Sequence, residues 1–334
     1  MDRPARLLWS SRVTGRFAPG PLDRDALVYV AGHRGLVGSA IVRALIRAGH
    51  TNVIGYTSAQ LDLRDRSATM DFLADARPRT VILAAARVGG IAANNAEPVE
   101  FLSDNLRIQT NVMDGALAAG VPRLLFLGSS CIYPKYAEQP IREDSLLTGT
   151  LEPTNDAYAI AKIAGIIGVQ SVRREYGLPW ISAMPTNLYG PGDNFDPQGS
   201  HLLPALIRRY REAVETGAGE VVNWGSGTPR RELLHVDDMA AACLHLLETY
   251  DGATQVNVGT GVDHTIAEIA AMVARATGYT GSTRWDATKP DGTPRKVLDV
   301  RSLAALGWRS TIALQSGIDE TVAWYAANRN LVRA

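Results

Sequence analysis

Short apolar runs alternate with longer helical segments through the first half of the chain. The strand-like runs lie at 27–31, 53–56, 81–85 and 124–127. Between them, residues 41–48 and 98–119 have the apolar spacing of helices. Strands that alternate with helices of this length are typical of crossover units and a parallel sheet. The pattern therefore predicts an α/β fold with a doubly wound parallel sheet of the Rossmann type.

A glycine-rich loop lies between the first of these strands and the first helix. Glycine at its first, fourth and last positions allows a tight turn, backbone approach to a pyrophosphate and close helix–strand packing. The helix N-terminus that follows favours negative charge. In this strand–loop–helix context we expect a nicotinamide dinucleotide site rather than a turn without a ligand. Its predicted cofactor-binding residues are Gly32, His33, Arg34, Gly35, Leu36, Val37 and Gly38.

The residues after the second strand bear on the choice of cofactor. An acid about 20 residues beyond the loop would bind the ribose 2′-hydroxyl of NAD. Residues 57–60 contain no acid, and Asp62 is the first to follow them. Arg34 either binds a 2′-phosphate through charge-assisted hydrogen bonds or is an ordinary surface arginine. We therefore expect NADP, used as NADPH.

The pattern loosens after about residue 190, where Gly- and Pro-rich stretches interrupt it. We expect residues 27–190 to form the NADP-binding Rossmann domain, with return segments near 230–262. Residues 191–334 should form mainly a smaller C-terminal α/β substrate lobe. The run 256–258 and a helix over 265–277 are expected to return to the main core. Residues 1–26 carry five arginines but no signal-peptide core, and we expect a loosely ordered extension, with a targeting peptide as the alternative.

Bulk composition excludes several classes of partner. Lys plus Arg and Asp plus Glu both number 34, so the net charge is zero and no basic field exists for nucleic acid or an anionic membrane. Two cysteines cannot form a disulfide framework, which indicates a reducing, cytoplasmic compartment. No apolar run has transmembrane length, and the six histidines show no metal-ligand spacing, so we expect no metal.

Tyr158 and Lys162 are four residues apart and share one helix face. There the ammonium can lower the pKa of the phenol, which would make Tyr158 a usable proton donor. Ser129 follows the strand-like run 124–127, so we expect it at the carboxyl edge of the sheet, where ligands bind in open α/β folds. A Tyr-x-x-x-Lys pair alone is usually a surface pair, but this order predicts nicotinamide-dependent carbonyl chemistry. The same helix is apolar on nearly every face, and we expect it to form a homodimer together with residues 98–119.

Cys131 and His201 leave two interpretations open. A free cysteine is most often a core residue, and a single histidine is most often structural. Near a cation, however, a thiol becomes a thiolate and can act as a base. Together the two side chains would supply a base and an acid beside a ketone. Further along, arginines near Trp224 suit a diphosphate and a flat base, although such arginines are often only solvated.

The chain resembles the extended short-chain dehydrogenase/reductase family, and within it members that act on GDP-bound keto sugars. The resemblance runs from about Leu27 to the C-terminus. The segments that carry it are 31–35, 88–91, 128–134, 151–155, 185–191, 224–229, 234–239 and 289–296.

This resemblance implies an NADPH-dependent enzyme that epimerises C3 and C5 of a GDP-4-keto-hexose and then reduces the 4-ketone. It implies that Cys131 is the base, His201 the acid, and Ser129, Tyr158 and Lys162 the reductase triad. The substrate contacts that it implies are Arg209, Trp224, Arg231 and Asp291. Beyond the glycine loop, the implied cofactor contacts are Leu127, Gly128, Ser129, Ser130, Tyr158, Lys162, Pro185, Thr186, Asn187, Leu188 and His201.

Two departures from the family pattern stand out. The first 26 residues have no counterpart in compact bacterial members, and Ser58 stands where some members carry an arginine after the second strand.

An alternative is an NAD-retaining nucleotide-sugar epimerase or dehydratase of the same fold. A dehydratase would normally have a glutamate near the carbonyl, where this chain has Cys131. A non-catalytic dinucleotide sensor is disfavoured because Tyr158 and Lys162 are both present.

Overall fold

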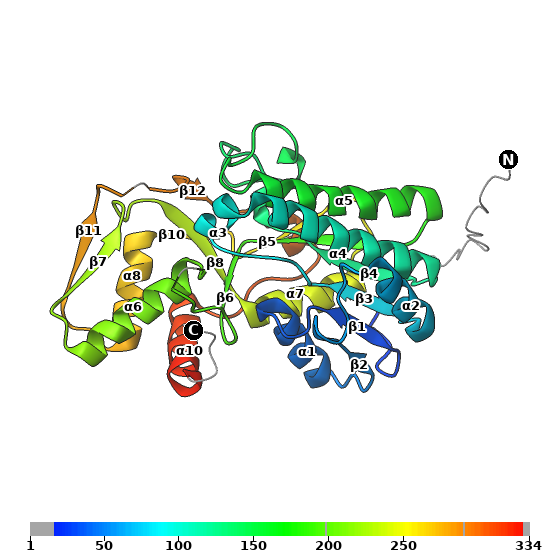
Figure 1. The fold of residues 1–334 in the computed structure, drawn as a ribbon, viewed down its shortest axis with the longest axis horizontal. Coiled ribbons are helices and arrows are strands. Elements are labelled where there is room, and N and C mark those ends of the chain that lie inside the picture. The colour runs from blue at the N-terminus through cyan, green and yellow to red at the C-terminus, as the bar shows by residue number, and fades with distance from the viewer. Residues whose placement is uncertain (1–16, 198, 290, 330–334) are drawn as a thin grey trace.

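The computed structural model describes residues 17–197, 199–289 and 291–329 (Figure 1). Its main sheet is parallel, with the strand order β2-β1-β3-β4-β5-β9. The strands are β1 (Val28–Ala31), β2 (Val53–Ile54), β3 (Thr80–Leu83), β4 (Arg123–Leu127), β5 (Ile181–Pro185) and β9 (Val256–Val258). The expected doubly wound α/β sheet is therefore confirmed. The strand order reverses between β1 and β3, the kind of switch point at which open α/β sheets bind ligands.

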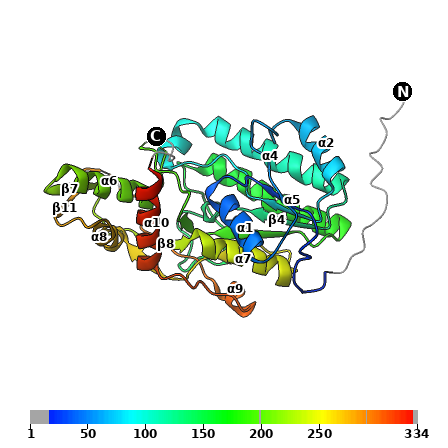
Figure 2. The same cartoon turned by 90° about the horizontal axis from the view of Figure 1, so that it is seen from below.

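Helices cover both faces of this sheet because successive strand residues point to opposite sides. Val28 and Val30 face a core shared with α1 (Leu36–Arg47) and α7 (Val236–Thr249). Tyr29 and Ala31 face the other core, which is built with α2 (Arg66–Ala76), α4 (Pro98–Ala118) and α5 (Asp156–Tyr176). Figures 1 and 2 show α4 and α5 on one side of the sheet and α1 and α7 on the other. Both cores consist of buried apolar side chains, and each fully buried Val, Leu, Ile or Phe among them stabilises the fold by about 1.5–3 kcal/mol.

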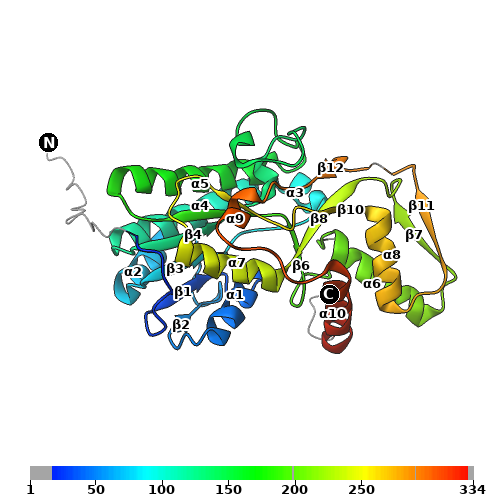
Figure 3. The same cartoon turned by 180° about the vertical axis from the view of Figure 1, so that it is seen from behind.

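A smaller lobe lies at the opposite end of the molecule from α2 (Figure 3). In it, β8 (Arg230–His235) pairs with β6 (Asn187–Tyr189), β10 (Asp263–Thr265) and β12 (Arg295–Lys296). A second pair joins β7 (Glu220–Trp224) to β11 (Ser282–Asp286). The helices α6 (Leu202–Thr216), α8 (Ile266–Thr277) and α10 (Leu314–Asn328) enclose its core. The short elements are α3 (Ile91–Ala96), α9 (Arg301–Ala305), η1 (Ser130–Ile132) and η2 (Glu143–Ser145).

The late segments divide between the two parts differently from the sequence prediction. The run 256–258 returns to the main sheet as β9, as expected. The helix expected to accompany it, α8, packs instead in the lobe core through Ile269 and Val273. It begins directly after β10, which pairs with β8, and a capping box of Thr265 and Glu268 starts it there. The main core gains Leu303 of α9 instead.

The start of the chain also differs from expectation. Residues 17–26 lie against α7, because Gly20 N donates to Glu248 O at 2.9 Å and Leu22 N donates to Glu248 Oε1 at 3.2 Å. The Phe17 ring centroid lies 4.2 Å from Cζ of the buried Arg123. These contacts hold residues 17–26 against the main core, where the sequence predicted a loosely ordered extension. Residues 1–16 lie outside the described part.

Candidate active site

The glycine loop at the end of β1 fits a dinucleotide pyrophosphate. Gly32 has a φ of +84°, and a Cβ there would lie 2.7 Å from Ala85 N. A Cβ on Gly38 would lie only 2.1 Å from Gly32 O, so α1 packs directly on the loop. Gly35 caps α1 without a side-chain hydrogen bond, and the first turn carries no acid. The first N–H groups of α1 are therefore free to bind an anion.

The two polar residues of this loop occupy different surroundings. The His33 ring lies against the end of β2, where a Cβ on Gly55 would lie 2.3 Å from its Cγ. Arg34 is exposed, and within the described residues no carboxylate oxygen lies within 4.0 Å of its guanidinium. Arg34 is thus free to receive an anionic group at the outer edge of the loop. Ser58, beyond β2, is also exposed.

The chemical centre begins where β4 ends. Leu127 O accepts a 2.9 Å hydrogen bond from Lys162 Nζ, and Gly128 is required because a Cβ there would lie 2.3 Å from Met184. Ser129 is the N-cap of η1, and its Oγ accepts from Cys131 N at 3.2 Å. This turn fixes the serine hydroxyl and the thiol next to each other at the carboxyl edge of the sheet.

Tyr158 reaches the same edge from the first turn of α5. Its hydroxyl and the Ser129 side chain form a hydrogen bond, and it lies near enough to Cys131 for their charges to interact. The Phe101 ring of α4 packs edge-on against it, with centroids 6.4 Å apart. Lys162 Nζ lies 5.9 Å from the centroid of the tyrosine ring. Ser129, Cys131, Tyr158 and Lys162 are therefore brought together.

The electrostatics of this centre depart from the sequence prediction. Burial raises the pKa of Tyr158, and the nearby Cys131 raises it further, while the Ser129 hydrogen bond lowers it. Burial lowers the pKa of Lys162 to about 7, since its side chain is almost fully enclosed. The expected lowering of the Tyr158 pKa by Lys162 is not found, because desolvation dominates at both groups. In this setting Ser129 is the residue that favours the ionised phenol.

The segment after β5 completes the cofactor side of the site. Pro185 ends β5, and Thr186 N continues the ladder by donating to Val258 O at 3.0 Å. Asn187 Nδ2 donates to Glu232 O at 2.9 Å, and Leu188 follows in β6. Because β6 pairs with β8, this segment carries the chain from the main sheet into the lobe.

His201 lies at the N-cap of α6 on the lobe side. Its loop meets the loop after β3, where a Cβ on Gly90 would lie 3.2 Å from Ser200 O. A Cβ on the preceding glycine would lie 3.0 Å from the Phe101 ring, which packs on Tyr158. The His201 side chain is accessible, yet the surrounding protein desolvates it and lowers its pKa. Within the described residues, no direct contact joins His201 to the tyrosine or the cysteine.

The four predicted substrate residues all lie in the lobe, with Arg209 on α6, Trp224 at the end of β7, Arg231 on β8 and Asp291 between β11 and β12. Arg209 Nη1 donates to Oδ1 of Asn223, the neighbour of Trp224 on β7, at 2.6 Å. Trp224 itself is 69% exposed, a large aromatic surface open to a ligand. Asp291 accepts from Ser226 Oγ at 2.6 Å. Arg231 Nη1 donates to Thr293 O at 2.6 Å, and the negative charge of Asp291 raises the pKa of Arg231 against the larger effect of burial. Burial lowers the pKa of both arginines, which makes them favourable places for an anion.

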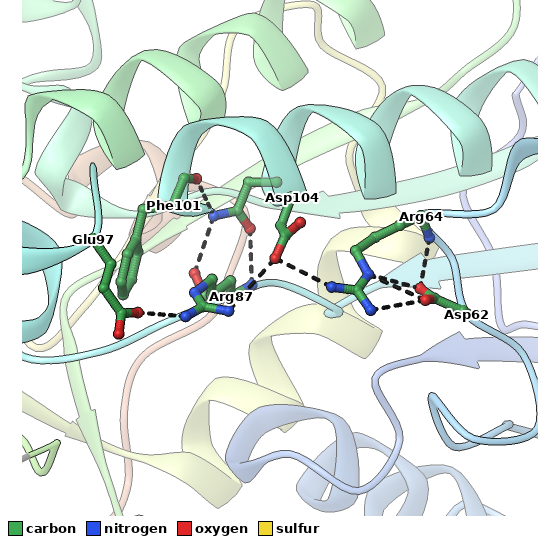
Figure 4. A network of polar contacts seen from close by, with 7 residues as sticks. Asp62, Arg64, Arg87, Glu97, Phe101 and Asp104 are labelled. Atoms are coloured by element: carbon green, nitrogen blue, oxygen red, sulfur yellow. Dashed lines mark hydrogen bonds and ion pairs between the residues drawn. The ribbon is translucent and has the colours of Figure 1, made fainter. Parts of the chain in front are cut away.

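Sequence reasoning missed two features of the site. The first is a polar network that anchors the loop after β3 (Figure 4). Arg87 forms ion pairs with Glu97 and with Asp104, the latter at 3.5 Å, and its guanidinium carbon lies 5.5 Å from the Phe101 centroid. Asn105 Nδ2 donates to Phe101 O at 2.7 Å. These long-range contacts hold the aromatic ring that packs on Tyr158, and spacing along the chain gives no sign of them.

The second missed feature is Lys296 on β12, whose Nζ lies 3.6 Å from Cys131 Sγ. The two residues are 165 positions apart. The only signal in the sequence was that Lys296 ends the segment 289–296, one of those that carry the family resemblance.

Two classes of feature are not found in the described part of the chain. No group of three or more His, Cys, Asp or Glu side chains is arranged to hold a metal ion there. No helix among those residues is both long and apolar enough to cross a membrane.

Comparison with known proteins agrees with this geometry. Residues 28–259 match the NAD dependent epimerase/dehydratase family. The chain is 56% identical to GDP-L-fucose synthase 1 of Arabidopsis thaliana, over 92% of this chain and 95% of that protein. It is 52% identical to GDP-L-fucose synthase of Escherichia coli (strain K12), over 92% and 98%. A crystal structure of a GDP-L-fucose synthetase from Naegleria fowleri bound to NADP has a TM-score of 0.87 at 27% identity, covering 95% of this chain and 98% of that one.

The chain belongs to the NAD dependent epimerase/dehydratase family, whose fold and glycine loop define a nicotinamide-dependent enzyme that acts on a small molecule. Within that family its relatives at 52–56% identity are GDP-L-fucose synthases, oxidoreductases with epimerase activity. The family resemblance noted in the sequence is thereby confirmed.

Proposed function

We propose that this chain converts GDP-4-dehydro-6-deoxy-D-mannose to GDP-L-fucose with NADPH as the reductant. The observation that carries the proposal is the convergence of Ser129, Cys131, Tyr158 and Lys162 at one edge of the sheet. A thiol beside a serine–tyrosine–lysine triad supplies a carbon base and a carbonyl proton donor in one place. The relatives named GDP-L-fucose synthase support the substrate and product.

The glycine loop and the strand ends would hold NADP. The free N–H groups of α1 suit the pyrophosphate, and Lys162 suits the nicotinamide ribose. The segments 127–130 and 185–188 flank the same edge. When bound, NADPH supplies the hydride that reduces the sugar ketone. Arg34, exposed and without a carboxylate partner among the described residues, is our candidate for the 2′-phosphate.

Cys131 and His201 would carry out the epimerisations at C3 and C5. Each carbon lies beside the C4 ketone, so its C–H bond can break with the electron pair moving into an enolate. Ser129 and Tyr158 can hydrogen bond the developing negative charge on the C4 oxygen. The Cys131 thiolate takes the proton from one face of the carbon, and protonated His201 returns one to the other face. Burial lowers the pKa of His201, so its donor form should be lost as the pH rises.

Tyr158 would complete the reduction. As hydride reaches C4, its hydroxyl gives a proton to the C4 oxygen, and Ser129 stabilises the resulting phenolate by hydrogen bonding. Arg209 and Arg231 would bind the GDP diphosphate, Trp224 would stack on the guanine, and Asp291 would shape the loop above it. Arginine suits a diphosphate because its planar fork binds two oxygens at once.

We also propose a homodimer through α4 and α5. Ile160 and Ile167 of α5 are 47% and 40% exposed, whereas Ile163 and Ile166 of the same helix are buried. Between the two helices lies a cavity of about 350 Å³, and Met113 and Val172 are among the residues that line it. An apolar face of this kind is a common protein–protein contact. A monomeric mass in light scattering at micromolar concentration would remove the dimer.

Because Cys131 must stay reduced to act as a base, we assign the chain to the cytoplasm.

One experiment tests the function as a whole. The pure protein is incubated with the 4-keto sugar nucleotide and NADPH, and the product is identified by NMR. GDP-L-fucose with stoichiometric NADPH oxidation is expected. A C4 epimer formed without net oxidation of the cofactor would replace this proposal with the cofactor-retaining epimerase.

The two stages are separable by mutation. Cys131→Ser should slow exchange of the C3 and C5 hydrogens with solvent deuterium while NADPH binding remains. If that variant kept full exchange and turnover, the assignment of Cys131 as the base would be wrong.

A further inference from the structure

Lys296 is a cation in direct contact with the proposed base. Its Nζ lies 3.6 Å from Cys131 Sγ, within hydrogen-bond distance for sulfur. Within the described residues, no carboxylate oxygen lies within 4.0 Å of Lys296, whereas the adjacent Arg295 is paired with Asp263. The group that Lys296 faces is the thiol.

The backbone around Lys296 is fixed from both sides. Val297 N donates to Gln139 Oε1 at 2.9 Å, and Leu298 N donates to Oε2 of the buried Glu232 at 2.8 Å. β12 pairs with β8, and Lys296 stands opposite Arg231 in the register. The ammonium is therefore presented by a rigid element, as a preorganised site requires. β12 also joins the thiol to the lobe strand that carries a proposed diphosphate ligand.

The other groups that face the sulfur are set for different tasks. Ser129 Oγ accepts from the backbone of Cys131. On α5, Tyr158 is neutral because burial raises its pKa, and Lys162 Nζ is bonded to Leu127 O. On β8, Arg231 donates to backbone carbonyl oxygens. Among the described residues, Lys296 is thus the one cation that donates a hydrogen bond to the sulfur.

We propose that Lys296 is a positioning residue for the epimerase base: its ammonium donates a hydrogen bond to Cys131 Sγ and holds the sulfur as a thiolate aimed at the sugar. This inference rests on the proposed function. In the step that it supports, the C–H bond at C3 or C5 breaks, the S–H bond forms and the electron pair enters the enolate on the C4 oxygen. Lys296 keeps its own proton throughout, and its charge stabilises the thiolate between turnovers.

The first test measures the thiolate directly and needs no substrate. The chain has two cysteines, and Cys243 is fully buried, so iodoacetamide should alkylate Cys131 selectively, with Cys131→Ser giving the background. Lys296→Met should slow alkylation at neutral pH by about tenfold or more, because an opposite charge this close favours the ionised thiol. Lys296→Arg should retain most of the rate. Lys135→Met is the matched control, since that lysine pairs with Glu152 in the loop after η1.

The second test follows deuterium exchange at C3 and C5 against pH. In Lys296→Met the rising limb of the exchange profile should move to higher pH, with KM for the sugar nucleotide changed less than the exchange rate. Lys296→Arg should restore the wild-type profile. If Lys296→Met fails to fold by circular dichroism, Lys296→Gln, which keeps a donor without the charge, replaces it in both tests.

Two results would overturn the proposal. One is alkylation of the Lys296→Met protein at the wild-type rate. The other is a rise in KM alone with an unmoved exchange profile, which would make Lys296 a substrate ligand. Failure of the wild-type protein to form GDP-L-fucose would instead end the proposed function, and the alkylation comparison would still decide whether Lys296 acts on the thiol.

Discussion

Lys162 offers a prediction in which stability and activity change in opposite directions. Its side chain is almost fully buried, and burial lowers its pKa from 10.5 to about 7. That difference corresponds to about 5 kcal/mol by which the buried charge opposes folding at low pH. Methionine is apolar and of similar length, but Lys162→Met would leave Leu127 O without its donor, at a cost of about 1–3 kcal/mol. We therefore expect the variant to be more stable than the wild type by about 2–4 kcal/mol near pH 6.

The sign of the pH dependence follows from proton binding. The unfolded lysine keeps its proton up to about pH 10.5, whereas the folded one loses it above about pH 7. Unfolding of the wild type therefore takes up a proton between these values, so wild-type stability rises with pH relative to the variant. The advantage of Lys162→Met should shrink from pH 7 upward by about 1.4 kcal/mol per pH unit, vanish between about pH 8.5 and 10, and then reverse because the lost hydrogen bond remains.

The assay is urea unfolding, followed by circular dichroism at several pH values, together with NADPH oxidation. NADPH oxidation should be lost in Lys162→Met, although the protein is folded. Lys135→Met, which removes a partly exposed ion pair, should show no such pH-dependent gap. A Lys162→Met protein that is less stable than the wild type at pH 6, or a gap that is constant with pH, would refute the reasoning.

Three further predictions concern single groups of the site. Tyr158→Phe keeps the contact with Phe101 but removes the proton donor, so NADPH oxidation should fall by about 10²–10⁴-fold while some deuterium exchange at C3 and C5 remains; a parallel loss of both would contradict separate stages. Gly38→Ala would place a Cβ 2.1 Å from a backbone oxygen, so NADPH affinity by fluorescence titration should fall by about tenfold or more, and unchanged affinity would place the pyrophosphate elsewhere. Asp291→Ala releases Ser226, so KM for the sugar nucleotide should rise more than kcat falls, whereas a loss confined to kcat would place this loop at the chemical centre.

The main sheet could be predicted from the sequence because its strands are buried on both faces. Runs such as 81–85 and 124–127 are continuously apolar, and the observed strands begin and end within two residues of them. The glycine loop could also be predicted from the sequence. The positive φ of Gly32 and the close approach of Gly38 to Gly32 O both require glycine. Helix α8 was misassigned because an amphipathic helix shows that it has a buried face, but not which core that face meets.

The chemical centre was predictable where its members lie close along the chain or follow a strand end. Ser129 and Cys131 share one turn, and Tyr158 and Lys162 share one helix face. Lys296 could not be found in this way, because its contact with the thiol depends on the pairing of two strands far apart in sequence. The directions of the pKa shifts at the site could not be predicted from the sequence either. They depend on how deeply Tyr158 and Lys162 are enclosed, which a spacing of four residues does not reveal.

The alternation of side chains along β12 has a consequence for engineering. Arg295 and Lys296 point to opposite sides of one short strand, the first toward Asp263 and the second toward the sulfur. If one amino acid were inserted in the crossing that precedes this strand and the register slipped by one residue, Arg295 would move into the position of Lys296. A guanidinium would then replace the ammonium next to the sulfur, and the carboxylate would lose its fork-shaped partner. At positions of that crossing other than Asp291, homologues and designed variants should therefore tolerate sequence change far better than a change in its length.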